Sequence, residues 1–182
     1  VSPATPVSPR LPYAIAKLAS EQYVRFFCER RGTVGSFVNV RFFGAYGPHE
    51  AARKITTRWL AAVLAGQREF VVRGNGENLI DFMYIDDAVD GLLSLATSPG
   101  VRLAVDFASG APVTVNHVVR AMAEVMGVEV GVRHDGHTEE CIEFRSTDTT
   151  MRDRFGFAPT VSLPDGLRRL RAHLETAADG HA

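Results

Sequence analysis

The sequence lacks the features that would place it among membrane, secreted or nucleic-acid-binding proteins. No apolar stretch approaches the length of a membrane span, and the N-terminus has neither the charged nor the apolar region of a signal peptide. The formal net charge is only -1, which gives no support for nucleic-acid binding through a basic face. Cys28 and Cys141 are far apart and form no Cys-x-x-Cys pair, which favours buried or free thiols in a reducing compartment. We therefore expect a cytoplasmic protein with neither nucleic acid nor membrane among its partners.

A glycine-rich dinucleotide-binding loop is absent as well. No Gly-x-Gly-x-x-Gly or Gly-x-x-Gly-x-x-Gly follows a predicted strand, and the run at 44–47 is only a turn. Such a loop normally holds a pyrophosphate against the N-terminus of a helix. The sequence therefore predicts that any such cradle lies outside these residues.

Lysine is scarce, and one of the two lysines stands in a chemically suggestive place. Lys17 and Lys54 are set against eighteen arginines. Lys17 follows Tyr13 by four residues in a predicted helix, so the two side chains share a face. A nearby ammonium favours the phenolate form of tyrosine, which suits proton transfer to or from a hydroxyl or carbonyl. The alternative interpretation is a simple surface contact on an amphipathic helix.

Hydrophobic periodicity predicts an α/β fold with a mainly parallel sheet, because strands alternate with helices along the chain. The predicted helices cover about 14–30, 52–65, 86–97, 114–126, 148–155 and 164–176. The predicted strands cover 36–43, 69–73, 79–85, 103–108 and 128–133. We expect Gly32 to end the first helix, Thr114 and either Asp86 or Asp87 to cap later ones, and the tail from Ala177 to fray.

Five segments share a further pattern. They read Pro-Tyr-Ala-Ile-Ala-Lys at 12–17, Arg-Phe-Phe-Gly-Ala-Tyr-Gly-Pro at 41–48, Arg-Lys-Ile at 53–55, Gly-Asn-Gly through Asp-Phe-Met-Tyr-Ile-Asp-Asp at 74–87, and Phe-Gly-Phe-Ala-Pro with Leu-Pro-Asp-Gly-Leu at 155–167. In this order and spacing they resemble the extended short-chain dehydrogenase/reductase family, in particular the NAD-dependent epimerase/dehydratases that act on nucleotide sugars. The resemblance covers nearly the whole chain but only about the later half of a family member.

The resemblance implies a fold and a division into regions. The fold would be the C-terminal part of a Rossmann-like doubly wound sheet plus the small substrate-binding α/β region. Residues 1–50 would be the remainder of the dinucleotide-binding domain. Residues 51–182 would be mainly the substrate-binding region, with 79–108 returning in part to the Rossmann sheet. The missing N-terminal half, or a second copy of the chain, would be the partner that covers its open side.

The resemblance also implies roles for individual residues, with NAD or NADP as the cofactor and a nucleotide sugar as the substrate. Tyr13 would be the acid/base, and Lys17 would hydrogen-bond the nicotinamide ribose and favour the phenolate. Phe42 and Phe43 would line the nicotinamide site. The candidate substrate-binding residues are Gly44, Arg53, Lys54, Arg73 and Arg145, of which Arg53 and Lys54 would meet a diphosphate.

Two positions depart from the family's usual residues. Gly44 stands where an asparagine is common, and Ile80 stands where an arginine commonly contacts the nucleotide diphosphate. The missing arginine keeps an NAD(P)-dependent hydroxysteroid-like dehydrogenase open as an alternative. The missing glycine-rich loop keeps open a second alternative, a catalytically incomplete fragment or non-enzymatic module.

Other polar groups are weaker candidates. His134 and His137, with Glu139 and Glu140 nearby, lie in a predicted loop that fixes no ligand geometry, so we expect no metal site. The adjacent carboxylates of residues 86 and 87 diverge on a helix, which favours capping over catalysis. Trp59 is expected in the core.

Overall fold

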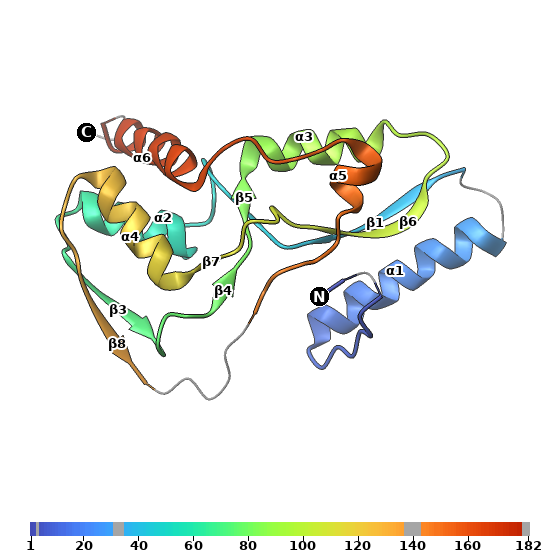
Figure 1. Ribbon diagram of the computed structural model, residues 1–182, viewed down its shortest axis with the longest axis horizontal. Coiled ribbons are helices and arrows are strands. Elements are labelled where there is room, and N and C mark those ends of the chain that lie inside the picture. The colour runs from blue at the N-terminus through green and yellow to red at the C-terminus, as the bar shows by residue number, and fades with distance from the viewer. Residues whose placement is uncertain (3, 31–34, 137–142, 180–182) are drawn as a thin grey trace. The chain divides into compact units, whose positions relative to one another are not determined.

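The computed structural model describes residues 1–2, 4–30, 35–136 and 143–179 and shows an α/β chain (Figure 1). The chain divides into two compact units, and each is described on its own. Unit 1 consists of Val1–Phe42, Asp90–Phe107 and Ser146–Ala158. Unit 2 consists of Phe43–Val89, Ala108–Arg145 and Pro159–Ala182.

Unit 1 contains a two-stranded parallel sheet and the helices beside it. Strands β1 (Phe37–Phe42) and β6 (Arg102–Phe107) pair in register from their first residues to their last. Helix α1 (Pro12–Arg30) begins at a proline, whose fixed φ suits the first turn. The unit also contains α5 (Thr150–Phe155) and the second half of α3 (Ile85–Ala96).

The core of unit 1 surrounds a buried aromatic ring on β6. Val105 and Phe107 are fully buried, and Phe157 packs on the Phe107 ring at 5.5 Å between centroids. Gly91 lets α3 approach this ring: a Cβ there would lie 2.4 Å from the Phe107 Cζ. The glycine is thus required by close packing, since any side chain would displace the helix.

Unit 2 contains three further two-stranded sheets. Parallel pairs join β2 (Ala45–Tyr46) to β5 (Met83–Tyr84) and β3 (Glu69–Arg73) to β8 (Gly131–Asp135). An antiparallel pair joins β4 (Leu79–Ile80) to β7 (Val113–Thr114). Three of the four strand pairs in the described chain are therefore parallel, as predicted.

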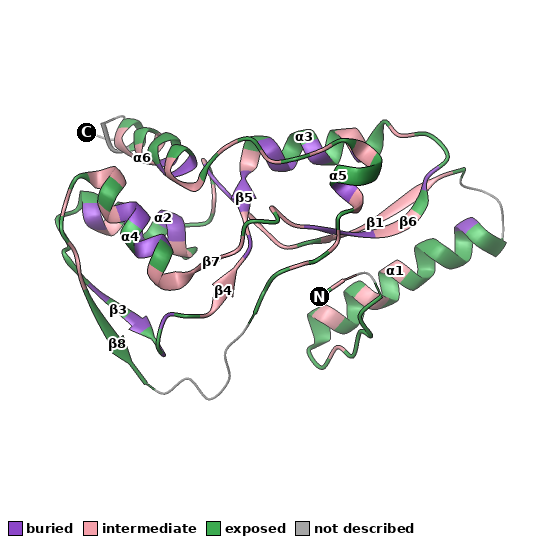
Figure 2. Cartoon of the chain, viewed as in Figure 1, coloured by how far each residue is buried: buried purple, intermediate pink, exposed green. Residues whose placement is uncertain are grey.

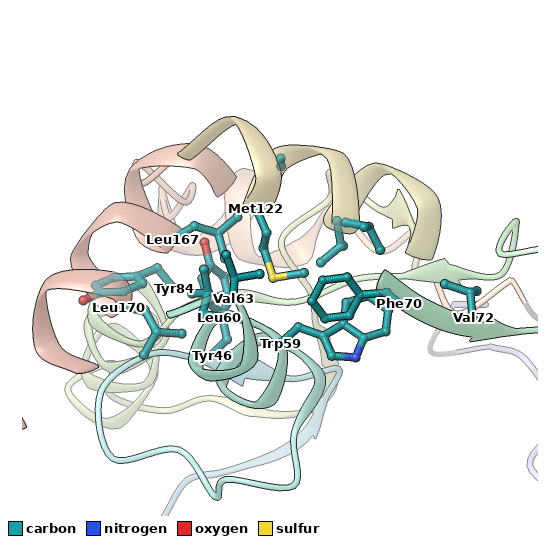
Figure 3. Close-up of a cluster of buried hydrophobic side chains, with 13 residues drawn as sticks. Tyr46, Trp59, Leu60, Val63, Phe70, Val72, Tyr84, Met122, Leu167 and Leu170 are labelled. Atoms are coloured by element: carbon teal, nitrogen blue, oxygen red, sulfur yellow. The ribbon is translucent and has the colours of Figure 1, made fainter. Parts of the chain in front are cut away.

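Three helices close over these strands and form one apolar core. They are α2 (Ile55–Leu64), α4 (Val115–Met126) and α6 (Leu163–Asp179). Figure 3 shows side chains from all three helices meeting, among them Leu60, Met122 and Leu167. Trp59 is buried there, as predicted, with its ring 5.5 Å from that of Phe70. Apolar residues at helical spacing make each helix cover the same core.

The structure confirms most predicted elements and shortens some. Thr114 caps α4 as expected, accepting a 3.1 Å bond from the His117 amide. The strand predicted at 128–133 starts later because Gly127 is left-handed and the Val128 amide still bonds the Ala123 carbonyl. The predicted strand at 79–85 is split into β4 and β5. Asp81, directly after β4, is fully buried and accepts hydrogen bonds from two backbone amides of the loop at 109–110.

Two of the predicted helix ends were wrong. Asp86 and Asp87 lie inside the first turn of α3, which begins at Ile85, and neither caps it. Buried Asp87 instead accepts three hydrogen bonds from residues 160–161, and Asp86 pairs with Arg169 at 3.1 Å. Helix α6 extends to Asp179, beyond the predicted end at about residue 176, and the fraying expected from Ala177 stays a prediction.

The expectations for the two cysteines and for Gly32 can be compared with the structure only in part. Cys28 is buried, as expected of a free thiol in this chain, whereas Cys141 and Gly32 lie outside them. Among the residues that the structure describes, every helix is too short or too polar to span a lipid bilayer.

Candidate functional site

Tyr13 and Lys17 lie next to each other on the first turns of α1. The Lys17 Nζ is 5.7 Å from the centre of the Tyr13 ring, as the i,i+4 spacing predicts. Tyr13 is 74% exposed, and Lys17 is exposed as well. The structure therefore brings the pair together and leaves both polar ends open to a ligand.

The two predicted cofactor-lining phenylalanines belong to different units. Phe42 ends β1 in unit 1, is 43% exposed, and stacks on buried Phe107 with 5.4 Å between ring centres. Phe43 begins the segment of unit 2 and packs on Phe144 at 4.6 Å. Ligands of open α/β folds bind at the carboxyl ends of the strands, which is where Phe42 stands.

Gly44 has a backbone conformation that explains the absence of a side chain. Its φ is +147°, which L-residues rarely adopt. A Cβ would still find room, since its closest neighbour would be the Phe82 Cβ at 3.7 Å. The glycine therefore follows from backbone geometry and not from crowding.

Arg53 and Lys54 precede the N-terminus of α2 and are both exposed. Lys54 is the N-cap residue and its side chain forms no capping bond. The carboxylate of Glu50 accepts bonds from the Thr56 and Thr57 hydroxyls, at 2.7 and 3.0 Å. Two cations beside the positive end of a helix form an environment that attracts an anion.

Arg73 lines a surface hollow of unit 2 with a volume of about 460 Å³. The hollow is lined by Ile55, Arg58, Trp59, Val71, Val72, Arg73, Val115 and Asp135. It combines an apolar wall with two guanidinium groups, which suits a ligand that has both an apolar ring and negative charge. Sequence reasoning missed Arg58 and Asp135. The spacing of Arg58 four residues after Lys54 was the available signal, since it puts both on one helix face.

Arg145 does not line this hollow. It is exposed and pairs with Glu143 at 2.9 Å. Ile80 is half-buried in β4, opposite Val113 of β7, and its apolar side chain brings no charge to the place where the family commonly has an arginine.

His134, expected in a loop, lies in strand β8 instead, and its side chain has a structural partner. The His134 Nε2 lies 2.9 Å from the Asn116 Oδ1. Residues 137, 139 and 140 lie outside the described ranges. Over 1–2, 4–30, 35–136 and 143–179 no group of three or more potential metal ligands occurs.

Burial raises the pKa of three packed groups. Burial in the core of unit 2 raises the pKa of Tyr46 well above its usual value, and burial raises the pKa of Tyr84 as well. Burial also raises the pKa of Asp106, whose carboxylate accepts a 3.0 Å bond from the Ser146 hydroxyl. Tyr46 and Tyr84 are therefore held as neutral phenols.

Known proteins with similar sequences are enzymes that modify nucleotide sugars. GDP-mannose 3,5-epimerase 1 of Oryza sativa subsp. indica is 28% identical over 171 residues, which are 92% of this chain and 44% of the relative. The dTDP-glucose 4,6-dehydratase of Streptomyces griseus is 26% identical over 172 residues, covering 89% of this chain and 49% of the relative. The chain spans about half the length of the curated relatives that it matches.

Solved structures agree with this similarity. The UDP-glucose 4-epimerase of Thermotoga maritima, solved with UDP-glucose, matches with a TM-score of 0.81 and 25% identity. The match covers 94% of this chain and 55% of the epimerase. A sequence model of the NAD dependent epimerase/dehydratase family matches residues 1–103, which is more than half of the chain. The chain therefore belongs to the NAD dependent epimerase/dehydratase family.

Proposed function

We propose that the natural protein containing these residues is an NAD(P)-dependent nucleotide-sugar epimerase or dehydratase. The observation that carries this proposal is the exposed Tyr13–Lys17 pair, with 5.7 Å between the ammonium and the phenol ring, inside the segment that matches the family. The similarity to a GDP-mannose epimerase and a dTDP-glucose dehydratase supports the nucleotide-sugar substrate.

Unit 1 would supply the proton chemistry. Tyr13 would take a proton from a sugar hydroxyl, or return one to a keto oxygen, and the Lys17 ammonium would stabilise its phenolate. The exposed ring of Phe42, at the carboxyl end of β1, offers an apolar surface that fits a nicotinamide ring. A bound nicotinamide supplies the acceptor and donor of hydride. Lys17 would also hold its ribose by a hydrogen bond.

Unit 2 would bind the substrate. Arg53 and Lys54 would meet a diphosphate at the start of α2, and Arg58 and Arg73 would hold the part of the nucleotide that enters the 460 Å³ hollow. Phe43, Gly44 and Arg145 remain proposed site residues in the same unit. Removing one of these cations should weaken binding without touching the proton transfer.

A second candidate function rests on Ile80. Its half-buried apolar side chain cannot pair with a diphosphate, which favours a less anionic substrate, as in hydroxysteroid-like dehydrogenases. The test is to titrate the natural protein with UDP-, GDP- and dTDP-sugars in the presence of NAD. Binding that weakens on Lys54→Met supports the nucleotide-sugar function; absence of binding by every nucleotide sugar would overturn it and leave the dehydrogenase.

We also propose that these residues alone do not form a complete cofactor site, because the sequence contains no glycine-rich cradle. Calorimetry of the 182-residue chain with NAD should therefore show no tight binding. Micromolar or tighter binding by this chain alone would contradict the proposal.

An exposed apolar face of α1 fits the proposal that a further segment or chain completes the protein. On α1, Tyr23, Phe26 and Phe27 are each 45–66% exposed, and residues 16, 19, 23 and 26 share a face of the helix. We propose that a dinucleotide-binding segment or a second copy covers this face. Light scattering of the isolated chain should show self-association that Phe26→Ser reduces, and a monomer at high concentration would count against it.

A further inference from the structure

The contact between α1 and β1 contains an ion pair that the proposed mechanism does not use. Arg41 on β1 donates from Nε to the Glu21 Oε2 at 3.2 Å and from Nη2 to Oε1 at 2.9 Å. Their side chains are only 26% and 12% exposed. The Asn39 side-chain amide donates to the Glu21 carbonyl at 3.4 Å. Two parallel bonds between planar groups fix orientation as well as distance.

Apolar packing does little to fix this helix. In α1 only Cys28 is buried, near the C-terminal end, while Ile15 is 50% exposed and Tyr13 is 74% exposed. Figure 2 shows most of α1 as exposed. The rotation of the helix about its own axis therefore depends on directional polar contacts more than on burial.

Arg41 is itself held from the other side. The hydrogen-bonded Glu21 raises the Arg41 pKa, and the charge of Asp106, which stands in register with Arg41 on β6, adds to this effect. Asp106 is buried, accepts a bond from the Ser146 hydroxyl, and donates its amide to the Asp148 carboxylate at 2.9 Å. The guanidinium thus has carboxylates on both flanks and little freedom to turn away from Glu21.

The Glu21–Arg41 ion pair is called the anchor of α1, and the position of Glu21 relates it to the Tyr13–Lys17 pair. Tyr13, Lys17 and Glu21 are spaced by four residues, so they follow one another along one side of the helix. Figure 1 shows α1 alongside β1, and the chain returns into β1 after α1 ends. Arg41 is the next-to-last residue of β1, and Tyr13 lies about 12 Å farther along the helix axis than Glu21. The anchor therefore presents Tyr13 and Lys17 beyond the carboxyl end of the strand, where α/β folds bind their ligands.

The pair also determines which charges surround Lys17. A released Glu21 carboxylate would have two cations within one turn on its own helix, Lys17 and Arg25. With Arg41 in place, the carboxylate is occupied, so it does not compete for the Lys17 ammonium. No ion pair of Lys17 occurs in the part of the chain that the structure describes.

We propose that Glu21 and Arg41 are positioning residues that hold the Tyr13–Lys17 side of α1 at the carboxyl end of β1. The proposal rests on the function proposed above for Tyr13. It assigns to this ion pair the orientation of the helix and to Tyr13 the chemistry itself.

The first test uses the 182-residue chain and amide hydrogen exchange followed by NMR. Arg41→Met should speed exchange at the amides of Leu18, Ala19 and Ser20 about tenfold, because the helix loses both bonds of its anchor. Glu21→Gln, which leaves Arg41 facing Asp106, should do the same in a chain that keeps its fold. Arg25→Met, which removes a charge from the same helix, is the matched control and should change exchange less than about twofold. Equal exchange in Arg25→Met and in both anchor variants would overturn the proposal.

The second test uses the natural protein with NAD and a nucleotide sugar that it turns over. Arg41→Met should lower kcat roughly 10- to 100-fold, the effect of misplacing a reacting group by about 1 Å, with KM within about twofold. If Arg41 only stabilised the fold, Arg41→Met would leave the kcat of the folded fraction unchanged. Activity that survives Tyr13→Phe would refute the proposed function. A wild-type kcat in Arg41→Met, where Tyr13→Phe is inactive, would refute only the positioning role.

Discussion

The helices of unit 2 and the first helix of unit 1 are fixed by different forces. In unit 2, Leu60, Leu167 and Leu170 are at most 1% exposed, and helices α2, α4 and α6 close over one core. In unit 1, α1 buries one residue and is tied to β1 through Glu21 and Arg41. In Figure 2, α1 is coloured mostly as exposed, whereas α2 and α4 contain buried segments. Arg58, one of the proposed substrate-binding residues, stands on a helix that packs into this core, whereas the proposed acid/base stands on a helix that depends on polar contacts.

This difference has a consequence for function. Apolar packing is non-directional, and it tolerates a surface change such as the loss of a cation on α2. A helix held by two hydrogen bonds at one residue is sensitive to the loss of its partner, because replacing Arg41 leaves the Glu21 carboxylate, whose side chain is 12% exposed, without both bonds. Chemistry and binding should therefore separate when the two units are mutated.

The largest expected effect is on chemistry in unit 1. Tyr13→Phe keeps the ring but removes the proton, and it should lower kcat by about 10³-fold or more, since it removes both the acid/base and its pairing with Lys17. KM should change little because the cations on unit 2 are intact. Steady-state kinetics of the natural protein measure this, and retained turnover would remove Tyr13 from the mechanism.

The next effect is on stability, and it compares the two regions directly. Leu60→Ala should destabilise unit 2 by about 3 kcal/mol, because a fully buried side chain leaves a cavity. Phe26→Ala, at a position 47% exposed on α1, should cost less than about 1 kcal/mol. Urea unfolding of the chain, at concentrations where light scattering shows a monomer, checks both values. Equal losses would mean that α1 is covered as fully as the core of unit 2, for instance by a second copy.

Substitutions of the cations in unit 2 should change KM and leave kcat nearly unchanged, the reverse of Tyr13→Phe. Lys54→Met and Arg73→Met should each raise KM for the nucleotide sugar about tenfold, the loss of one charge-assisted contact, with kcat nearly unchanged. Arg171→Met is a matched control, because this arginine pairs with Glu175 on α6 and does not line the hollow. A fall in kcat without a change in KM would place these cations in the chemistry instead.

The smallest expected effect is on the pH dependence of stability, and it comes from Asp106 in unit 1. Burial raises the pKa of Asp106, so the folded state holds its proton more tightly than the unfolded state does. The contribution of Asp106 to stability therefore falls as pH rises above the usual aspartate value of about 3.8 and through the raised value. Asp106→Asn removes the titrating carboxyl and therefore this pH dependence of the unfolding free energy. The difference in unfolding free energy, mutant minus wild type, should grow as pH increases from about 3 to 7, and a constant difference would contradict it.

Much of the local structure could be predicted from sequence because its causes are local. The boundaries of β3 and the capping of α4 by Thr114 follow from alternation and from a hydroxyl three residues before an amide. The family was predicted from segments such as 12–17 and 41–48, and the match over 1–103 confirms it. The start of helix α3 was less predictable. Asp87 has the sequence position of a cap, but its carboxylate accepts hydrogen bonds from the amides of Thr160 and Val161, which are distant in sequence.

The sequence by itself determined the period of each element, the i,i+4 placement of Tyr13 and Lys17, and the positions where the family's usual residues are replaced. These depend on spacing alone. Only the tertiary structure decided which long-range partners the polar groups take. Arg41 on β1 binds Glu21 on α1, Arg58 and Arg73 share a hollow, and Asp81 interrupts a predicted strand by bonding the loop at 109–110. The physical reason is that a charged or hydrogen-bonding side chain is satisfied by any suitable group within reach, and folding alone brings that group close.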